Sequence, residues 1–89
     1  MYKIIIFTIE DCVHCLNLKN RLNQLSIPYE EIDVDLNPDI WKEVCSQTNE
    51  DSVPTIFIIK NDEDIGTLYV PGVDYDTEDE IIDILLTHI

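Results

Sequence analysis

Residues 2–25 have the sequence YKIIIFTIEDCVHCLNLKNRLNQL. Residues 2–8 are rich in isoleucine and aromatic side chains, and apolar residues occupy both alternating sets of positions. This pattern is typical of a strand that is covered on both faces, in a sheet with parallel neighbours. From residue 12 to residue 25 the apolar side chains recur every three or four positions, which predicts a helix with one buried face. The segment therefore predicts a central strand followed directly by a helix.

Both ends of this predicted helix are marked in the sequence. Asp11 is placed to cap the N-terminus, and Pro28 prevents the helix from continuing. The apolar face consists of Cys15, Leu18, Leu22 and Leu25. After the proline, residues 29–35 alternate acidic and apolar side chains, which is the period of a half-buried strand. The chain is therefore expected to open with a strand, a helix and a second strand.

The middle of the chain predicts a second helix and a hairpin. The helix is expected to run from Asn37, an N-cap followed by a proline, to about Thr48. Its apolar face consists of Ile40, Trp41, Val44 and Cys45. Residues 55–60 and 65–70 predict two strands, and the polar residues 61–64 between them predict the turn that joins them.

A capping box marks the start of the last helix. Thr77 and Glu80 stand three residues apart, so each side chain can accept a hydrogen bond from the backbone of the other. Acidic residues fill the first turn, where the helix dipole favours them. The apolar face consists of Ile81, Ile82, Leu85, Leu86 and Ile89. The predicted order of elements is βαβαββα, which is an α/β chain.

The length of 89 residues predicts one domain, spanning residues 1–89. Nineteen Asp and Glu residues against five Lys and Arg residues give a formal net charge of -14. Nucleic acids and anionic membrane surfaces bind through Lys and Arg, so both are excluded as main partners. The apolar run from Ile4 to Phe7 is too short for a signal segment or a membrane span. We expect a cytoplasmic monomer, whose thiols are kept reduced unless they cycle.

Two of the three cysteines, Cys12 and Cys15, are separated by two residues at the junction of the first strand and the first helix. Unpaired N–H groups and the dipole at a helix N-terminus stabilise a thiolate, which makes Cys12 the expected nucleophile. Cys15 lies one turn deeper on the same face, where it can resolve a mixed disulfide. His14, when protonated, would stabilise the thiolate. The negative charges of Glu10 and Asp11 oppose it, so the expected lowering of the pKa of the Cys12 thiol is moderate.

Metal binding is the main alternative use of this cysteine pair. A zinc site would need a second pair of ligands, and neither Cys45 nor the two histidines have the required spacing. Cys45, on an apolar helix face, is interpreted as a small core residue. The acidic residues between positions 74 and 80 lack the glycine and the terminal acid of a calcium loop. No metal ligand is therefore assigned.

With these features the chain resembles the glutaredoxin and thioredoxin family over nearly its whole length. The resemblance rests on the C-V-H-C motif of residues 12–15 and on Val53-Pro54-Thr55, a valine–proline pair directly before a strand. It implies a thioredoxin-like fold with a four-stranded mixed sheet flanked by three helices. It also implies that Pro54 is cis and faces the cysteines, and that the backbone of Val53 pairs with the substrate like an added strand. The implied activity is that of a thiol–disulfide oxidoreductase.

The substrate-binding residues that the resemblance implies are His14, Val53, Pro54, Gly72 and Asp74. Glutaredoxins usually hold glutathione with a basic residue ahead of the cysteine motif and with a Gly-Gly turn followed by an acid. Here Glu10 and Asp11 replace the basic residue, and Pro71-Gly72 replaces the Gly-Gly pair. Asp74 or Asp76 is then the candidate partner for the amine of glutathione. No tightly bound cofactor is implied, and glutathione is a candidate reductant.

Three functions stay open from the sequence. A glutaredoxin would reduce the disulfides of proteins or of glutathione through Cys12 and Cys15. Small glutaredoxin-like redoxins, which the Asp11-Cys12-Val13 start also resembles, pass electrons to ribonucleotide reductase and receive them from thioredoxin reductase. A redoxin-like interaction module without catalysis is the third. The paired thiols favour an enzyme, and since glutathione is itself negative, the acidic site is expected to bind it weakly.

Overall fold

The computed structural model describes residues 2–60 and 66–88. Its elements are β1 (Tyr2–Thr8), α1 (Val13–Gln24), β2 (Glu30–Asp33), α2 (Pro38–Thr48), β3 (Thr55–Lys60), β4 (Gly66–Tyr69) and α3 (Glu78–His88). This order confirms the predicted βαβαββα arrangement. The predicted turn at 61–64, the first residue of the 65–70 strand and Ile89 lie outside the described residues. No helix in the described ranges is both long enough and apolar enough to cross a membrane.

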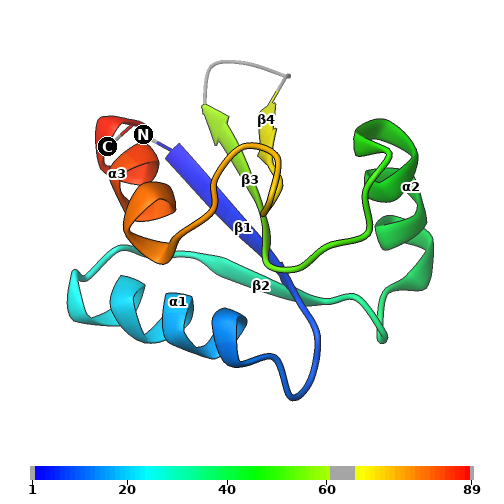
Figure 1. Ribbon diagram of the computed structural model, residues 1–89, viewed down its shortest axis with the longest axis horizontal. Helices are drawn as coiled ribbons and strands as arrows, with labels where there is room; N and C mark the ends of the chain where they lie inside the picture. Colours follow the sequence, from blue (N-terminus) through cyan, green and yellow to red (C-terminus); the bar gives the residue numbers. More distant parts are fainter. Residues whose placement is uncertain (1, 61–65, 89) are drawn as a thin grey trace.

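The four strands form one mixed sheet in the order β2-β1-β3-β4 (Figure 1). β1 is paired on both sides, as a central strand should be, and it runs parallel to β2. Its other neighbour, β3, is antiparallel to it, so only one neighbour of β1 is parallel and the sheet is mixed, as the resemblance implied. β3 and β4 are antiparallel, as the predicted hairpin requires.

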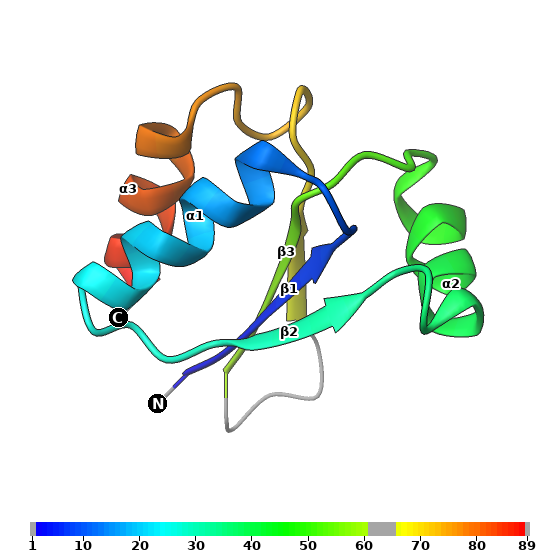
Figure 2. The same ribbon diagram turned by 90° about the horizontal axis from the view of Figure 1, so that it is seen from below.

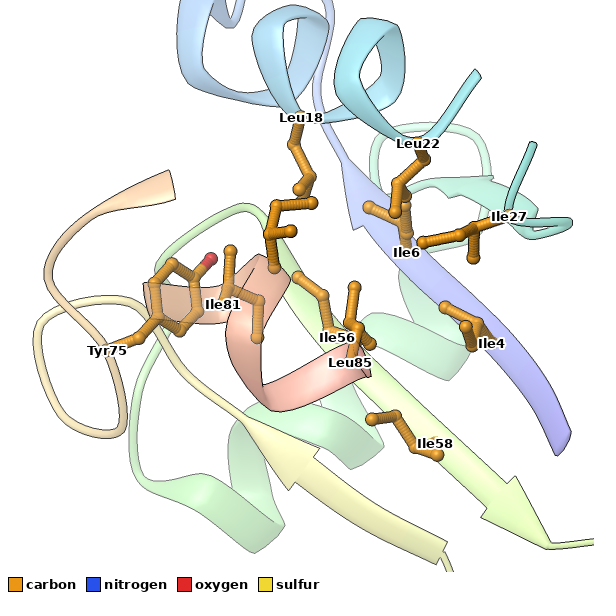
Figure 3. Packing of buried hydrophobic residues seen from close by; sticks show 11 residues of the cluster. Ile4, Ile6, Leu18, Leu22, Ile27, Ile56, Ile58, Tyr75, Ile81 and Leu85 are labelled. Carbon is orange, nitrogen blue, oxygen red and sulfur yellow. The ribbon is translucent and has the colours of Figure 1, made fainter. Parts of the chain in front are cut away.

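The helices lie in two layers, with α1 and α3 on one face of the sheet and α2 on the other (Figure 2). The larger core is packed beneath α1 and α3 (Figure 3). Its most deeply buried residues are Ile6, Leu18, Leu22, Ile56, Ile81 and Leu85. The smaller core joins Phe7 and Val44, with Trp41 packed against it. Because neighbouring residues of β1 enter different cores, the prediction that this strand is covered on both faces is confirmed.

The predicted cap of the first helix is wrong by one residue. Asp11 has a left-handed backbone with φ 62, whereas an N-cap residue needs an extended one. Cys12 has the extended conformation and is the N-cap, so α1 begins at Val13. At the other end, Leu25 lies beyond the last helical turn and is 45% exposed, so it does not belong to the buried stripe.

The other caps differ in how well the sequence predicted them. The capping box is confirmed, because Thr77 Oγ1 accepts the Glu80 N–H at 3.2 Å and Glu80 Oε1 accepts the Thr77 N–H at 3.2 Å. Asn37 is the N-cap of α2, but its side chain donates to the Asp33 carbonyl at 2.9 Å and caps nothing. The carboxylate of Asp33 in turn accepts the Asp35 N–H at 2.9 Å, a local turn that ends β2 before the predicted boundary at residue 35.

Two apolar side chains that were assigned to buried helix faces are exposed. Ile40 lies in the first turn of α2 and is 47% exposed, and Leu86 near the end of α3 is 48% exposed. Each stands beside a residue that does face the core, since Trp41 and Leu85 are packed inward. The buried face of both helices is therefore narrower than the run of apolar residues indicates.

Candidate functional site

The sulfur of Cys12 caps α1. Cys12 and Cys15 form a disulfide, with their Cα atoms 5.2 Å apart. Cys12 Sγ accepts a hydrogen bond from the Cys15 N–H at 3.1 Å, so it provides the N-cap interaction that was expected from Asp11. The first N–H groups of a helix have no partner within the helix, and they favour negative charge. After reduction, the same N–H group and helix dipole would stabilise a thiolate on Cys12.

Cys12 and Cys15 differ in solvent exposure. Cys15 is 2% exposed and lies on the core side of α1. Cys12 is half-buried at the helix end, and His14 beside it is exposed. A disulfide of a large substrate can therefore approach Cys12, while Cys15 stays covered. This difference in exposure agrees with the expected roles, in which Cys12 attacks and Cys15 resolves, and those roles stay a prediction.

A cleft of about 550 Å³ opens beside the disulfide and is called the redox cleft here. Both cysteines line it, together with the loop of residues 9–11, the exposed side chain of Leu16 and the polar residues Thr8, Lys19, Glu31 and Asp33. Glu31 Oε2 accepts hydrogen bonds from Lys19 Nζ at 2.8 Å and from Thr8 Oγ1 at 2.7 Å. These two donors hold the pKa of the Glu31 carboxyl below its usual value. Sequence reasoning did not find this group, because its three members come from different elements.

A second hollow, of about 250 Å³, lies on the other side of the helix start and is called the proline cavity here. Its lining includes His14, Val53 and Pro54, so the structure brings these three predicted residues together. The Val53–Pro54 bond is cis, as the resemblance implied. Of these two hollows, Cys12 lines the redox cleft and not the proline cavity, while residues of α1 line both.

Gly72 and Asp74 shape a turn and do not line either hollow. Gly72 has φ +83 and donates its N–H to the carbonyl of Tyr75 at 2.7 Å. Asp74 Oδ2 accepts the Val70 N–H at 2.8 Å. The carboxylate of Asp74 is thus used within the loop between β4 and α3. Asp76, the alternative acid, does line the proline cavity.

Tyr75 is a site residue that the sequence did not reveal. Its ring is 7% exposed, and its hydroxyl donates a hydrogen bond to the carbonyl oxygen of Pro54. Burial raises the pKa of this hydroxyl well above its ordinary value, which keeps it a proton donor. The contact joins the loop of residues 49–54, called the proline loop here, to the loop before α3. Its two partners are 21 residues apart in the sequence, so no local pattern could have indicated it.

Replacing Tyr75 with phenylalanine is expected to lower the free energy of unfolding by about 1–2 kcal/mol, because the buried carbonyl of Pro54 would lose its donor. Urea denaturation measures this loss. Tyr29→Phe is the matched control, since Tyr29 is only partly buried where it packs against the larger core. Equal losses in the two variants would show that the Tyr75 hydroxyl does not hold the proline loop.

Cys45 stands apart from this site. It is the free cysteine of the structure and lies half-buried on α2, on the opposite face of the sheet from α1. Burial, followed by the nearby negative charge of Asp51, raises the pKa of its thiol. Within residues 2–60 and 66–88, no three His, Cys, Asp or Glu side chains are grouped so that they could hold a metal ion.

Comparison with known proteins agrees with this geometry. The model of the glutaredoxin family matches residues 4–65, while no curated protein sequence matches the chain. Among solved structures, the germline-specific thioredoxin Deadhead of Drosophila melanogaster superposes with a TM-score of 0.68 at 14% identity, over 99% of this chain and 81% of that one. Fasciola hepatica thioredoxin gives 0.66 at 17% identity, over 99% and 81% of the two chains. A thioredoxin variant from Halobacterium salinarum gives 0.63 at 21% identity, over 97% and 73%.

At these identities the structural neighbours establish the fold, which is thioredoxin-like as the resemblance implied. The family model covers more than half of the chain, including the paired cysteines and the Val53–Pro54 bond. Members of this family need no tightly bound cofactor, since the two thiols carry the electrons. The chain therefore belongs to the glutaredoxin family of thiol–disulfide oxidoreductases.

Proposed function

We propose that the reduced protein acts as a glutaredoxin-type dithiol reductase, in which Cys12 attacks substrate disulfides and Cys15 releases the product. The observation that carries the proposal is the hydrogen bond from the Cys15 N–H to Cys12 Sγ at 3.1 Å. It supports Cys12, the N-cap residue of α1, as the residue whose thiolate is stabilised. The burial of Cys15 supports the assignment of the second step to that residue.

The reaction takes place in two exchanges. The Cys12 thiolate attacks one sulfur of the substrate disulfide, the substrate S–S bond breaks, and the departing sulfur leaves as a thiolate that takes a proton from water. Cys15 then loses its proton and attacks Cys12 Sγ, which breaks the mixed disulfide and releases the second substrate sulfur. The substrate gains two electrons and two protons, and the protein is left with the Cys12–Cys15 disulfide, which is the state that the structure shows.

A new cycle requires two electrons from a thiol reductant. Two molecules of glutathione, or a reductase dithiol, can reduce the Cys12–Cys15 disulfide by the same exchange run in reverse. If glutathione is the electron donor, the protein acts as a glutaredoxin. If thioredoxin reductase is the electron donor, the protein belongs with the redoxins that pass electrons to ribonucleotide reductase. The substrate itself is proposed to be a protein that presents an extended segment to the backbone of Val53, beside the proline cavity.

The test is disulfide reduction with each donor in turn. Insulin or a mixed-disulfide peptide serves as the substrate, and the donor is either glutathione with glutathione reductase or thioredoxin reductase alone. Turnover with glutathione supports the glutaredoxin assignment, and turnover only with thioredoxin reductase overturns it in favour of the other branch. If neither donor nor dithiothreitol supports turnover, the dithiol reductase proposal fails and a binding module remains.

A further inference from the structure

The two hollows beside the start of α1 are lined by acidic side chains. Glu10, Asp11, Glu31 and Asp33 line the redox cleft, and Asp76 and Glu78 line the proline cavity. A substrate disulfide that reaches Cys12 must bring its flanking residues into or over these hollows. The acids do not create the site, which the disulfide defines, but they set the charge that a substrate meets there.

Basic groups offset little of this charge. Lys19 lines the redox cleft and its ammonium pairs with Glu31 at 2.8 Å, so these two charges offset each other and the remaining negative charge of the cleft comes from Glu10, Asp11 and Asp33. Arg21 comes within 3.7 Å of Glu78 from outside the proline cavity, and it lies closer to Asp79, at 2.8 Å. In the described part of the chain, the ion pairs do not include Glu10 or Asp11. The loop directly before the nucleophile therefore keeps two uncompensated carboxylates.

Glu78 adds a separate observation. Its Oε2 is the atom near Arg21, whereas its Oε1 is buried and has no hydrogen-bond partner among the described residues. Glu78 lines the proline cavity and its side chain is 33% exposed, so a lysine or arginine of a substrate that enters the cavity can pair with this carboxylate.

We propose that this site selects disulfides flanked by lysine or arginine on a partner protein with a basic contact surface, and that it disfavours acidic disulfides, including that of glutathione. The proposal rests on the dithiol exchange proposed above. Charge complementarity of this kind acts mainly on the rate of association, and salt screens it over about 10 Å at 0.1 M ionic strength. The net charge of -14 adds an attraction at longer range, so the local and the global contributions must be separated.

The experiment measures the second-order rate of reduction of three self-quenched fluorescent peptide disulfides by the reduced protein in a single turnover. The peptides are identical except that lysine, glutamine or glutamate flanks the cysteine. Their rates with dithiothreitol are measured separately and divided out, because flanking charge also changes the reactivity of the disulfide. We expect the lysine peptide to react at least ~10-fold faster than the glutamate peptide at 20 mM salt, and less than ~3-fold faster at 0.5 M.

Two double variants test which acidic residues cause the preference for the lysine peptide. Glu10→Gln with Asp11→Asn, and Asp76→Asn with Glu78→Gln, are each expected to reduce the lysine-to-glutamate ratio by at least ~2-fold. Asparagine suits position 11, because it tolerates the positive φ found there. The matched control is Glu43→Gln with Glu50→Gln, which removes the same charge from α2 and the residues just after it. This control is expected to leave the ratio nearly unchanged.

The outcomes separate this inference from the function it rests on. Equal rates for the three peptides, with normal turnover, would overturn the charge selection and leave the exchange reaction standing. A control variant that lowers the ratio as much as the site variants would also overturn it, since net charge alone would then account for the preference. A protein that reduces none of the peptides would instead contradict the proposed function.

Discussion

The Cys12→Ser protein is expected to lose disulfide reductase activity by at least about 1000-fold, because a serine hydroxyl at this position stays protonated and cannot attack sulfur. The Cys15→Ser protein is expected to stop at a different step, the release of the product. It keeps the nucleophile at the N-cap and can still complete the first exchange, but it has no thiol to release the product. Insulin reduction driven by dithiothreitol measures the first effect, and mass spectrometry of the trapped mixed disulfide measures the second.

Cys45→Ser is the control for both variants. This thiol lies on α2, away from the disulfide, and is expected to contribute nothing to turnover. The Cys15→Ser adduct should be attached to Cys12 in peptide mapping. Adducts on Cys45, or a Cys12→Ser protein that turns over at the parent rate, would contradict the assignment of the nucleophile.

The Leu85→Ala protein is expected to be less stable by about 3 kcal/mol, since truncation of a fully buried leucine removes apolar burial and leaves a cavity. Leu85 is 0% exposed and packs in the larger core beneath α1 and α3 (Figure 3). A domain of this size has a small free energy of unfolding, so the loss would be a large share of it. Urea denaturation followed by far-UV circular dichroism measures the change.

The adjacent residue provides a matched comparison. Leu86 is 48% exposed, so Leu86→Ala should change the free energy of unfolding by less than about 0.5 kcal/mol. The sequence pattern alone assigns both leucines to the apolar face of α3. Similar losses from the two substitutions would contradict the orientation of α3 against the sheet.

Local patterns predicted the fold well where a single element decides the outcome. The isoleucine-rich β1 strand, the stripe of Leu18 and Leu22, and the capping box of Thr77 and Glu80 all depend on residues close in sequence. Boundaries were less accurate, because the cap of α1 depends on the backbone conformation of Asp11 and not on its side chain. A cytoplasmic location and a monomeric state stay predictions.

The site was predictable only in part, because some of its contacts join residues that are far apart in the sequence. Cys12 and Cys15 carry a recognisable spacing, and the resemblance supplied Pro54. The contact between Tyr75 and the Pro54 carbonyl joins segments 21 residues apart, and the Lys19–Glu31 pair joins α1 to β2. Such contacts are fixed only when the sheet order places these segments side by side, and no periodicity in the chain encodes them.

The most direct test of the account is the pH dependence of alkylation of the individual cysteines. In the reduced Cys15→Ser protein, the rate of iodoacetamide modification of Cys12 and of Cys45 is followed by mass spectrometry from pH 5 to pH 10. Because the N–H group of residue 15 and the dipole of α1 stabilise the thiolate, Cys12 is predicted to reach half its maximal rate below about pH 8.5, the ordinary pKa of a free thiol. Burial raises the pKa of Cys45, so this thiol should reach its own midpoint at higher pH. A midpoint for Cys12 at or above that of Cys45 would contradict the claim that the helix N-terminus activates Cys12.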